Sequence, residues 1–324
     1  MSLGNPDRPV GGIAVRPPDG VDLRPLARDD LGDAVALARE GRSVPSLADV
    51  APLRERYDAL MNDADTVAFL ATAEGAAAGV AVMQLRRRLN YATFEGWLSD
   101  LWVTPGAGGR GIEGALLQAV VAEWELRGGH RILAQVHAVV PGRREALAAA
   151  GFEEAFLDFE LSPVIPPERR DAAGLSIRPV GPQDADAVTR LIAEFGPRRS
   201  PVPDRMEAVL RTYSAHVRDV EAGRAASVVA ELDGTTVGVC ALEWQRPFWT
   251  TDLHAWIADL VVTEPMRGRG IGRALMEAAL ATSAGAGAVA VGLETGEQRV
   301  SAHALYRSMG FAEPGRTWVL HRDG

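Results

Sequence analysis

The sequence has very little cysteine and no long apolar run. Its single cysteine, Cys240, cannot form an intramolecular disulfide, which excludes a disulfide framework and predicts a reducing, cytoplasmic location. No run of about 18 consecutive apolar residues occurs, so neither a transmembrane helix nor a membrane partner is expected. The six histidines show neither a His-Glu-x-x-His motif nor a zinc spacing that contains cysteine, so we expect no catalytic metal.

Positive charge is also scarce. The 34 lysine and arginine residues are outnumbered by 43 aspartate and glutamate residues, which gives a formal net charge of −9. A protein that binds nucleic acid needs a basic face, so we expect no nucleic-acid partner. The length of 324 residues and the hydrophobic content of 47% are instead typical of two ordinary domains, each with its own packed core.

An internal duplication accounts for this length. Gly151 and Gly310, each followed by phenylalanine, are separated by 159 residues, and other landmarks repeat at the same offset. Between Trp97–Leu116 and Trp256–Leu275, 11 of 20 positions are identical without a gap. A period of this size indicates two domains with one topology, not a solenoid.

Each copy is predicted to contain the same series of elements. A first strand and helical segments precede a strand pair, of which the Asp-Gly turn at Asp233-Gly234 is the clearest hairpin signal. A longer strand, a glycine-rich loop, a helix, another strand, a short helix and a last strand follow. The predicted domains are residues 20–162 and 175–324, joined by a proline-rich and then charged linker at 163–174.

The second copy is organised around a glycine-rich stretch between a buried strand ending at Val262 and an Ala/Leu-rich helix from Ala274 to Leu280. Glycines at a strand-to-helix turn let the backbone approach a ligand closely. The unpaired N–H groups of the first helical turn then bind phosphate, and arginines add cationic donors. The residues predicted to hold this ligand are Arg267, Gly268, Arg269, Gly270, Ile271, Gly272 and Arg273.

Two other glycine-rich loops do not match this stretch, because it has neither the Gly-Lys-Ser/Thr of a Walker loop nor the Gly-x-Gly-x-x-Gly of a dinucleotide site. The pattern Arg-x-x-Gly-x-Gly resembles the acyl-CoA loop of the GNAT superfamily of N-acetyltransferases. The closing segment from Leu305 to Phe311 resembles the Leu-Tyr-x-x-x-Gly-Phe of the same superfamily. The resemblance covers nearly all of both copies. It implies an α/β fold of two tandem GNAT-type domains, each with a mixed, mostly antiparallel sheet flanked by helices.

The resemblance also implies acetyl-CoA as co-substrate and assigns site residues. Leu260, Val261 and Val262 match the splayed strand whose backbone pairs with the pantetheine arm. Tyr306 matches the tyrosine that donates a proton to the departing thiolate. The family often has an asparagine seven residues before this tyrosine. Here that position is Arg299, which could reach a phosphate of the cofactor instead.

The general base is left open by the sequence. Asp259 lies on the strand before the loop, but Asp100 repeats it in the first copy, which equally indicates a structural role. Glu294 lies on the following strand, where GNAT proteins often carry a glutamate. Glu243 and His254 lie on strands predicted to line the acceptor cleft, and ordered water with a remote carboxylate is a further alternative.

The two copies are not equally equipped. In the first copy Glu113 replaces Gly272, Leu147 replaces Tyr306, and Gly108 replaces the arginine before the glycines. A carboxylate near the pyrophosphate position repels that group. We therefore expect a working C-terminal domain and a degenerate N-terminal one. The alternative is that Glu113 points outward and both copies bind the cofactor.

The predicted function is transfer of an acetyl group from acetyl-CoA to a primary amine of a small molecule or peptide, catalysed by the C-terminal domain. The alternative is a non-catalytic acyl-CoA sensor or scaffold, and the loop does not exclude a longer acyl chain. The expected partners are the amine substrate and, in a homodimer, a second copy of the chain. Trp244 and Trp249 have no aromatic counterparts in the first copy and fit either an acceptor pocket or a domain interface.

Overall fold

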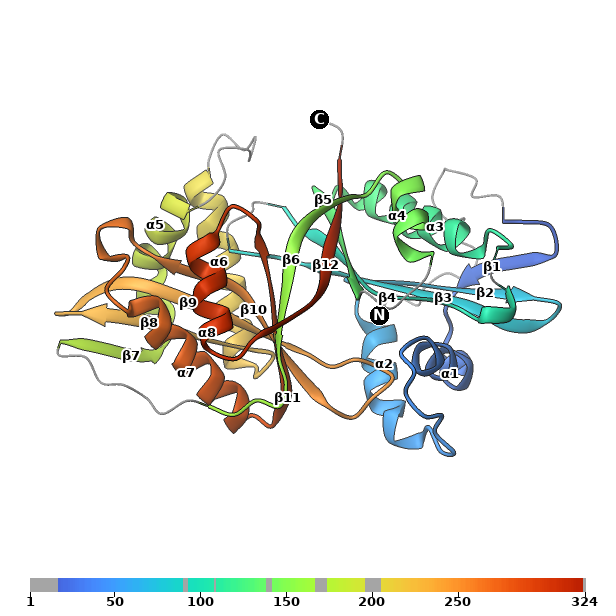
Figure 1. Cartoon of the computed structure of the whole chain (residues 1–324), viewed down its shortest axis with the longest axis horizontal. Helices are drawn as coiled ribbons and strands as arrows, with labels where there is room; N and C mark the ends of the chain where they lie inside the picture. The colour runs from blue at the N-terminus through green and yellow to red at the C-terminus, as the bar shows by residue number, and fades with distance from the viewer. Residues whose placement is uncertain are drawn as a thin grey trace.

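The two halves of the chain share a twelve-stranded mixed β-sheet (Figure 1). The computed structural model describes residues 17–89, 93–107, 109–137, 142–166, 174–195 and 205–322. In their order across the sheet, the strands are β1 (Val21–Pro25), β2 (Thr66–Ala73), β3 (Ala76–Arg86), β4 (Glu95–Val103), β5 (Arg131–His137), β12 (Ala312–His321), β6 (Glu153–Leu161), β11 (Ala288–Gly296), β10 (Leu253–Val262), β9 (Thr235–Gln245), β8 (Ala225–Leu232) and β7 (Leu175–Pro179).

Helices cover both faces of the sheet in each half. In the N-terminal half they are α1 (Leu31–Gly41), α2 (Arg54–Asn62), α3 (Ile112–Arg127) and α4 (Arg143–Ala149). In the C-terminal half they are α5 (Ala185–Phe195), α6 (Arg205–Glu221), α7 (Ile271–Gly285) and α8 (Val300–Ser308). Within the described ranges, none of these helices is long and apolar enough to span a membrane.

Alternation along the strands explains the two helical layers. On β3, Val80 and Val82 pack with the residues of α1 and α2, whereas Ala81 and Met83 pack with those of α3. Successive side chains of a strand point to opposite faces of the sheet, so a strand that is buried on both faces is apolar throughout. Cys240 lies on β9 and is fully buried in the layer of the second half that contains α7, the counterpart of α3, so it is a core residue.

The predicted α/β class and the repeated order of elements are confirmed. Both halves run through strand, two helices, a strand hairpin, a third strand next to the hairpin, helix, strand, helix and last strand. The strand after the hairpin, which was expected to be longer, has 9 residues in β4 and 10 in β10, against 11 in β3 and β9. The hairpin turn predicted at Asp233-Gly234 is present, with φ of 50° and 77°. Positive φ at both central residues gives the twist that joins two antiparallel strands tightly. Glu74 and Gly75 form the equivalent turn in the first half.

The last strand of each half completes the sheet of the other half. β6, which ends the N-terminal half, pairs with β11, and β12, which ends the chain, pairs with β5. β6 and β12 also pair with each other and lie side by side at the centre of Figure 1. This exchange joins the two expected sheets into one. Most of the predicted linker, residues 167–173, lies outside the described residues.

Each half also inserts a hairpin loop into the other. Phe248, from the β9–β10 loop, is buried among α1 and α2, where its ring meets the edge of Tyr57 at 6.0 Å between centroids. Leu89, from the β3–β4 loop, is buried among α5 and α6 together with Tyr213. The two helical layers next to the interface are therefore cores built from both halves.

Polar contacts fasten the β9–β10 loop to the N-terminal half. The Arg56 guanidinium donates hydrogen bonds to the backbone oxygens of Thr250 and Asp252 at 2.8 and 2.5 Å. The Arg39 guanidinium donates to the Trp249 oxygen at 3.0 Å. The orange loop that reaches α2 in Figure 1 is this segment. Trp249 therefore lies at the interface between the halves.

We expect Phe248→Ala to lower the free energy of unfolding of the whole chain by about 3–4 kcal/mol, because it empties a fully enclosed site. Leu126→Ala is the control, since the Leu126 side chain is 61% exposed on α3. Chemical denaturation followed by circular dichroism and by tryptophan fluorescence measures both. A loss below about 1 kcal/mol for Phe248→Ala would show that the loop does not hold the halves together.

Candidate functional site

The predicted glycine loop leads into α7, and two of its residues have backbone conformations that only glycine adopts readily. Gly268 and Gly270 have φ of 77° and 81°, and α7 begins at Ile271. A side chain at Gly272 would meet its nearest atoms only at 3.9 Å, so the protein leaves room there. The N–H groups of the first helical turn have no partner four residues back. The loop is a cradle of bare backbone suited to an anion.

Three arginines surround this cradle. Arg267 and Arg269 are exposed, and the Arg267 Nε donates to the Val262 oxygen at 3.0 Å. Arg273 is half-buried and donates to the Ser308 hydroxyl of α8. The guanidinium groups add positive charge to a helix N-terminus that already favours anions.

A β-bulge separates the strands next to the cradle. β10 and β11 pair in parallel only from Leu253 to Trp256. The register with β9 then shifts between Ile257 and Asp259, so that Ala258 is the extra residue of a bulge. A bulge bends its strand and ends regular pairing. From Leu260 to Val262, β10 pairs with β9 on one side and no longer pairs with β11 on the other. On that edge the Val262 oxygen accepts the hydrogen bond from Arg267.

The predicted carboxylates lie on the sheet face that α5 and α6 cover. Glu243 opposes Trp256 across the β9–β10 ladder and Asp259 opposes Ala241, and both partners pack with the α5–α6 layer. Opposed residues of a ladder project from the same face. Glu294 on β11 follows Leu293, which belongs to the opposite layer, so Glu294 also projects toward α5 and α6.

Arg88, from the β3–β4 loop of the N-terminal half, connects these acidic groups. Its guanidinium forms an ion pair with Glu294 and donates to the backbone oxygen of Ala258, the bulged residue. The same group lies 3.8 Å from Glu95. Arg88 is nearly buried, and its positive charge lowers the pKa of Asp259, which burial raises.

The carboxylates differ in their readiness to accept a proton. Burial raises the pKa of Glu243 to about 7 and that of Asp259 to about 6, against opposing contributions from Arg86 and Arg88. Asp259 Oδ2 is buried without a hydrogen-bond partner. Glu243 is half-buried and has no ion pair or hydrogen bond among the described residues. A carboxylate with a pKa near neutrality and a free face is suited to proton abstraction.

Tyr306 lies on the opposite face of the sheet, which α7 and α8 cover. Its ring packs against Phe159 at 5.4 Å and Phe311 at 6.0 Å between centroids. Burial raises the pKa of Tyr306 to about 12, so the phenol stays protonated and can donate. Arg299 precedes the first turn of α8 and opposes this shift in the pKa of Tyr306. The Tyr306 phenol and the glycine cradle therefore lie on the sheet face that α7 and α8 cover, and the carboxylates lie on the opposite face. The gap where β10 and β11 stop pairing separates the two groups.

The equivalent opening in the N-terminal half is filled by a side chain. β4 bulges at Ser99 just as β10 does at Ala258. Arg143 of α4 donates to the Leu101 oxygen, on the strand edge that is free in the other half, and to Glu113 at 2.5 Å. Glu113 is half-buried and paired with Arg143, whereas the alternative of two cofactor sites had it pointing outward. Gly108, the remaining substitution in this loop, lies outside the described residues.

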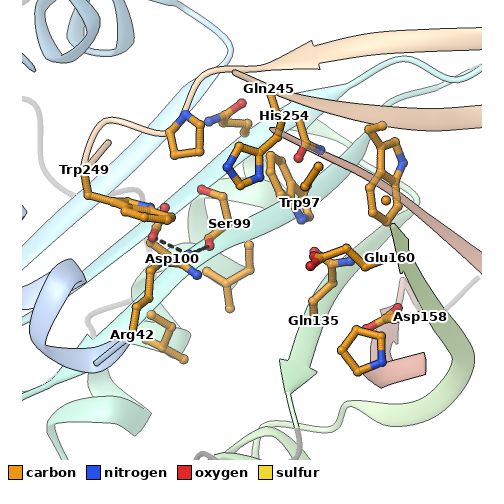
Figure 2. A pocket seen from close by; sticks show the side chains of 18 of the residues that line it. Arg42, Trp97, Ser99, Asp100, Gln135, Asp158, Glu160, Gln245, Trp249 and His254 are labelled. Atoms are coloured by element: carbon orange, nitrogen blue, oxygen red, sulfur yellow. Dashed lines mark hydrogen bonds and ion pairs between the residues drawn. The ribbon is translucent and has the colours of Figure 1, made fainter. Parts of the chain in front are cut away.

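A cavity lies beside this filled opening, between the two halves (Figure 2). Trp97 and Asp100 of β4, Gln135 of β5 and Glu160 of β6 line it from the N-terminal half. The β9–β10 hairpin closes it with Trp249 and Gln245. His254, which the sequence assigned to the acceptor cleft, also lines this cavity, and burial lowers its pKa. Trp249 therefore contributes to a pocket as well as to the interface.

Arg88 and Arg143 were not predicted from the sequence. Arg88 lies in a loop of the other half, and a comparison of the copies shows nothing of contacts between them. Arg143 could have been found from the repeat, because it lies 159 residues before Ala302. Glu113 and Arg143 of the first copy thus replace Gly272 and Ala302 of the second copy together. Among the residues with a described placement, no group of His, Cys, Asp or Glu side chains could hold a metal ion.

The model of the acetyltransferase (GNAT) family matches residues 36–152 and again residues 187–311, which together are most of the chain. The chain belongs to the GNAT family of acetyltransferases. An uncharacterized N-acetyltransferase of Bacillus subtilis, YhdJ, is 46% identical over 59 residues. That match covers 18% of this chain and 42% of the Bacillus protein, so it spans less than half of that relative.

Solved structures share the tandem fold. A GCN5-related N-acetyltransferase from Sphaerobacter thermophilus superposes with a TM-score of 0.63 at 20% identity, over 95% of this chain and 96% of that one. A tandem GNAT protein from the clavulanic acid biosynthesis pathway gives 0.61 at 19% identity, over 94% and 99%. At these identities the likeness concerns the fold.

Proposed function

We propose that the C-terminal half transfers an acetyl group from acetyl-CoA to a primary amine of a small molecule or peptide. The observation that carries the proposal is the difference between the two strand openings. The opening beside β10 has a backbone cradle at one end, a protonated phenol on one face and carboxylates on the other. The opening beside β4 is filled by Arg143.

The residues of this half fit acetyl-CoA. The N–H groups from Gly268 to Arg273 and the guanidinium groups of Arg267 and Arg269 would hold the pyrophosphate, because the nearest described atoms lie 3.9 Å from where a side chain at Gly272 would begin. The edge of β10 from Leu260 to Val262 would pair with the amide groups of the pantetheine arm, as a neighbouring strand does. Arg299 is placed for a further anionic contact.

The amine must lose a proton to attack the thioester carbonyl, and we assign its uptake to Glu243. Glu243 has the free carboxylate, whereas Glu294 is held in its ion pair with Arg88. Attack forms the carbon–nitrogen bond and a tetrahedral oxyanion, which a backbone N–H of β10 stabilises. Collapse breaks the carbon–sulfur bond, and Tyr306 donates its proton to the departing thiolate. The products are the N-acetyl amine and CoA.

The N-terminal half contributes to this chemistry through Arg88. Its guanidinium holds Glu294 and the carbonyl of the bulged Ala258, which fixes the carboxylate face of the opening. Its charge also keeps the pKa values of Glu243 and Asp259 from rising further on burial. Asp259 and Glu294 are accordingly positioning groups around Glu243, and Arg88 acts through them. The acetylating half is incomplete without the loop of its neighbour.

Arg269→Glu is expected to weaken acetyl-CoA binding at least tenfold, because it places a carboxylate beside the pyrophosphate. Arg110→Glu makes the same change at the equivalent position of the N-terminal half, where Arg110 pairs with the exposed Glu74 at 3.4 Å, and should leave binding unchanged. Isothermal titration calorimetry compares the two. Equal losses in both variants would contradict the assignment of the cofactor to the C-terminal half.

Tyr306→Phe should lower kcat by about 10²-fold or more while the affinity for acetyl-CoA changes little, because the phenol acts on the leaving thiolate and not on the bound ground state. Release of free thiol from acetyl-CoA with a panel of amines measures the rate. Calorimetry measures the binding. An unchanged rate removes Tyr306 from the mechanism, and the absence of turnover by the unaltered protein with every amine supports an acyl-CoA sensor instead.

Arg88→Met should move the acidic limb of the kcat/KM profile to higher pH. The limb reports the base that must be deprotonated, and removal of a nearby positive charge raises the pKa values of Glu243 and Asp259, which are near 7 and 6. Arg87→Met is the control, because Arg87 is exposed and pairs with Asp65 at the surface. A lower rate with an unmoved limb would mean that Arg88 is merely structural.

A further inference from the structure

Four polar residues at the centre of the sheet break the symmetry of the repeat. Gln135 of the first copy and Glu294 of the second are separated by the 159-residue offset, and so are Asp158 and Thr317. In the structure Gln135 opposes Thr317 between β5 and β12, and Asp158 opposes Glu294 between β6 and β11. The two pairs occupy equivalent places in the two halves, but the pair that includes β11 consists of two carboxyl groups.

Both of these carboxyl groups are removed from water. Asp158 is 3% exposed, and the Glu294 side chain is 4% exposed. Directly opposed residues of an antiparallel ladder project from the same face, with their Cβ atoms about 5 Å apart. Two buried carboxyl groups at this separation repel each other strongly when both are ionised. One of the two is therefore expected to hold a proton.

The contacts of the two side chains indicate which of them holds it. Glu294 forms an ion pair with the Arg88 guanidinium, which favours its ionised form. Asp158 Oδ1 accepts a hydrogen bond from the Thr317 hydroxyl, and Asp158 Oδ2 is buried without a hydrogen-bond partner among the described residues. An ionised oxygen enclosed in this way is costly, whereas a protonated one needs only an acceptor. The Glu294 carboxylate on the opposing strand is suited to be that acceptor.

The electrostatic surroundings of Asp158 agree with this assignment. Burial raises the pKa of Asp158 to about 7, and the negative charge of Glu294 raises it as well. Thr317, Gln135 and the positive charge of Arg316 on β12 act in the opposite direction. The protonation of Asp158 therefore changes near neutral pH.

We propose that Asp158 and Glu294 share one proton, with Asp158 as its donor, and that Asp158 is a positioning residue for the carboxylate face of the C-terminal opening. Asp158 acts through Glu294, because it binds one carboxylate oxygen while Arg88 binds the other. The pair then presents a single negative charge to the Arg88 guanidinium. The N-terminal half thus supports that opening through its exchanged strand β6 as well as through the loop of Arg88. The positioning role rests on the proposed acetyl transfer, whereas the shared proton does not.

NMR titration of the full chain, isotope-labelled at the aspartate carboxyl groups, tests the shared proton. The Asp158 signal is assigned by its loss in Asp158→Asn and should titrate near pH 7. Glu294→Gln should lower that pKa by about 1 or more, because the opposed negative charge is gone. Glu153→Gln is the control on the same strand, since Glu153 is exposed, and it should leave the titration unmoved. An Asp158 pKa of about 4, or one that Glu294→Gln does not lower, overturns the proposal.

The pH dependence of stability is a second readout. A carboxyl group whose pKa is raised by folding stabilises the folded chain below about pH 4, and this stabilisation is lost as the pH rises through about 7. The denaturation midpoint of the unaltered chain should therefore fall over this range relative to that of Asp158→Asn. Parallel curves for the two chains would contradict a shared proton.

The rate of acetyl transfer tests the positioning role. The amide of Asp158→Asn can still donate to Glu294 and accept from Thr317, so its kcat should exceed that of Asp158→Ala at least tenfold. Equal rates in the two variants would overturn the positioning role. The absence of turnover by the unaltered chain would instead contradict the proposed function, and the titration would still decide whether the proton is shared.

Discussion

A single extra residue in β10 ends its pairing with β11, and this is where we propose that acetyl-CoA binds. The bulge at Ala258 bends β10 away from β11 and leaves a strand edge with unpaired backbone groups inside an otherwise continuous sheet. Unpaired backbone groups inside a protein need partners. In the C-terminal half the Arg88 guanidinium satisfies the Ala258 oxygen and Arg267 satisfies the Val262 oxygen, and we propose that the backbone groups between them pair with the ligand. The N-terminal half has the same bulge and satisfies the edge with Arg143.

Exchange of the last strands makes the halves interdependent. Across the centre of the sheet, Gln135 opposes Thr317, and Asp158 opposes Glu294, so polar groups from both halves lie on neighbouring strands. The Thr317 hydroxyl donates to Asp158, whose pKa burial raises to about 7. With the reciprocal hairpins of Leu89 and Phe248, this arrangement gives the N-terminal copy a structural role even if, as we propose, it does not bind acyl-CoA. It supplies its neighbour with the core residue Leu89, with the positive charge of Arg88 and with one wall of the cavity between the halves.

The sequence predicted the repeat, the α/β class and the glycine-led turn into α7, because these depend on local pattern and on a constant offset. Asp233-Gly234 predicts its turn from two residues alone. The strand exchange was not predictable in this way, because β6 and β12 are equivalent strands and their patterns fit either partner. Arg88 was missed for the same reason, since its partners Glu294 and Ala258 lie in the other copy. The roles of Tyr306, Glu294 and Asp259 stay predictions. They are assigned to the C-terminal half because Gly272 and Ala302 stand there at the positions that Glu113 and Arg143 occupy in the N-terminal half.

The most direct test of the account is the structure of the chain with acetyl-CoA in excess, together with the binding stoichiometry. The account predicts one acetyl-CoA per chain, with its pyrophosphate against the N–H groups from Gly268 to Arg273 and its thioester between β10 and β11. Arg143 should keep its contact with the Leu101 oxygen. Two molecules per chain, or density at the start of α3 and none at the start of α7, would contradict it.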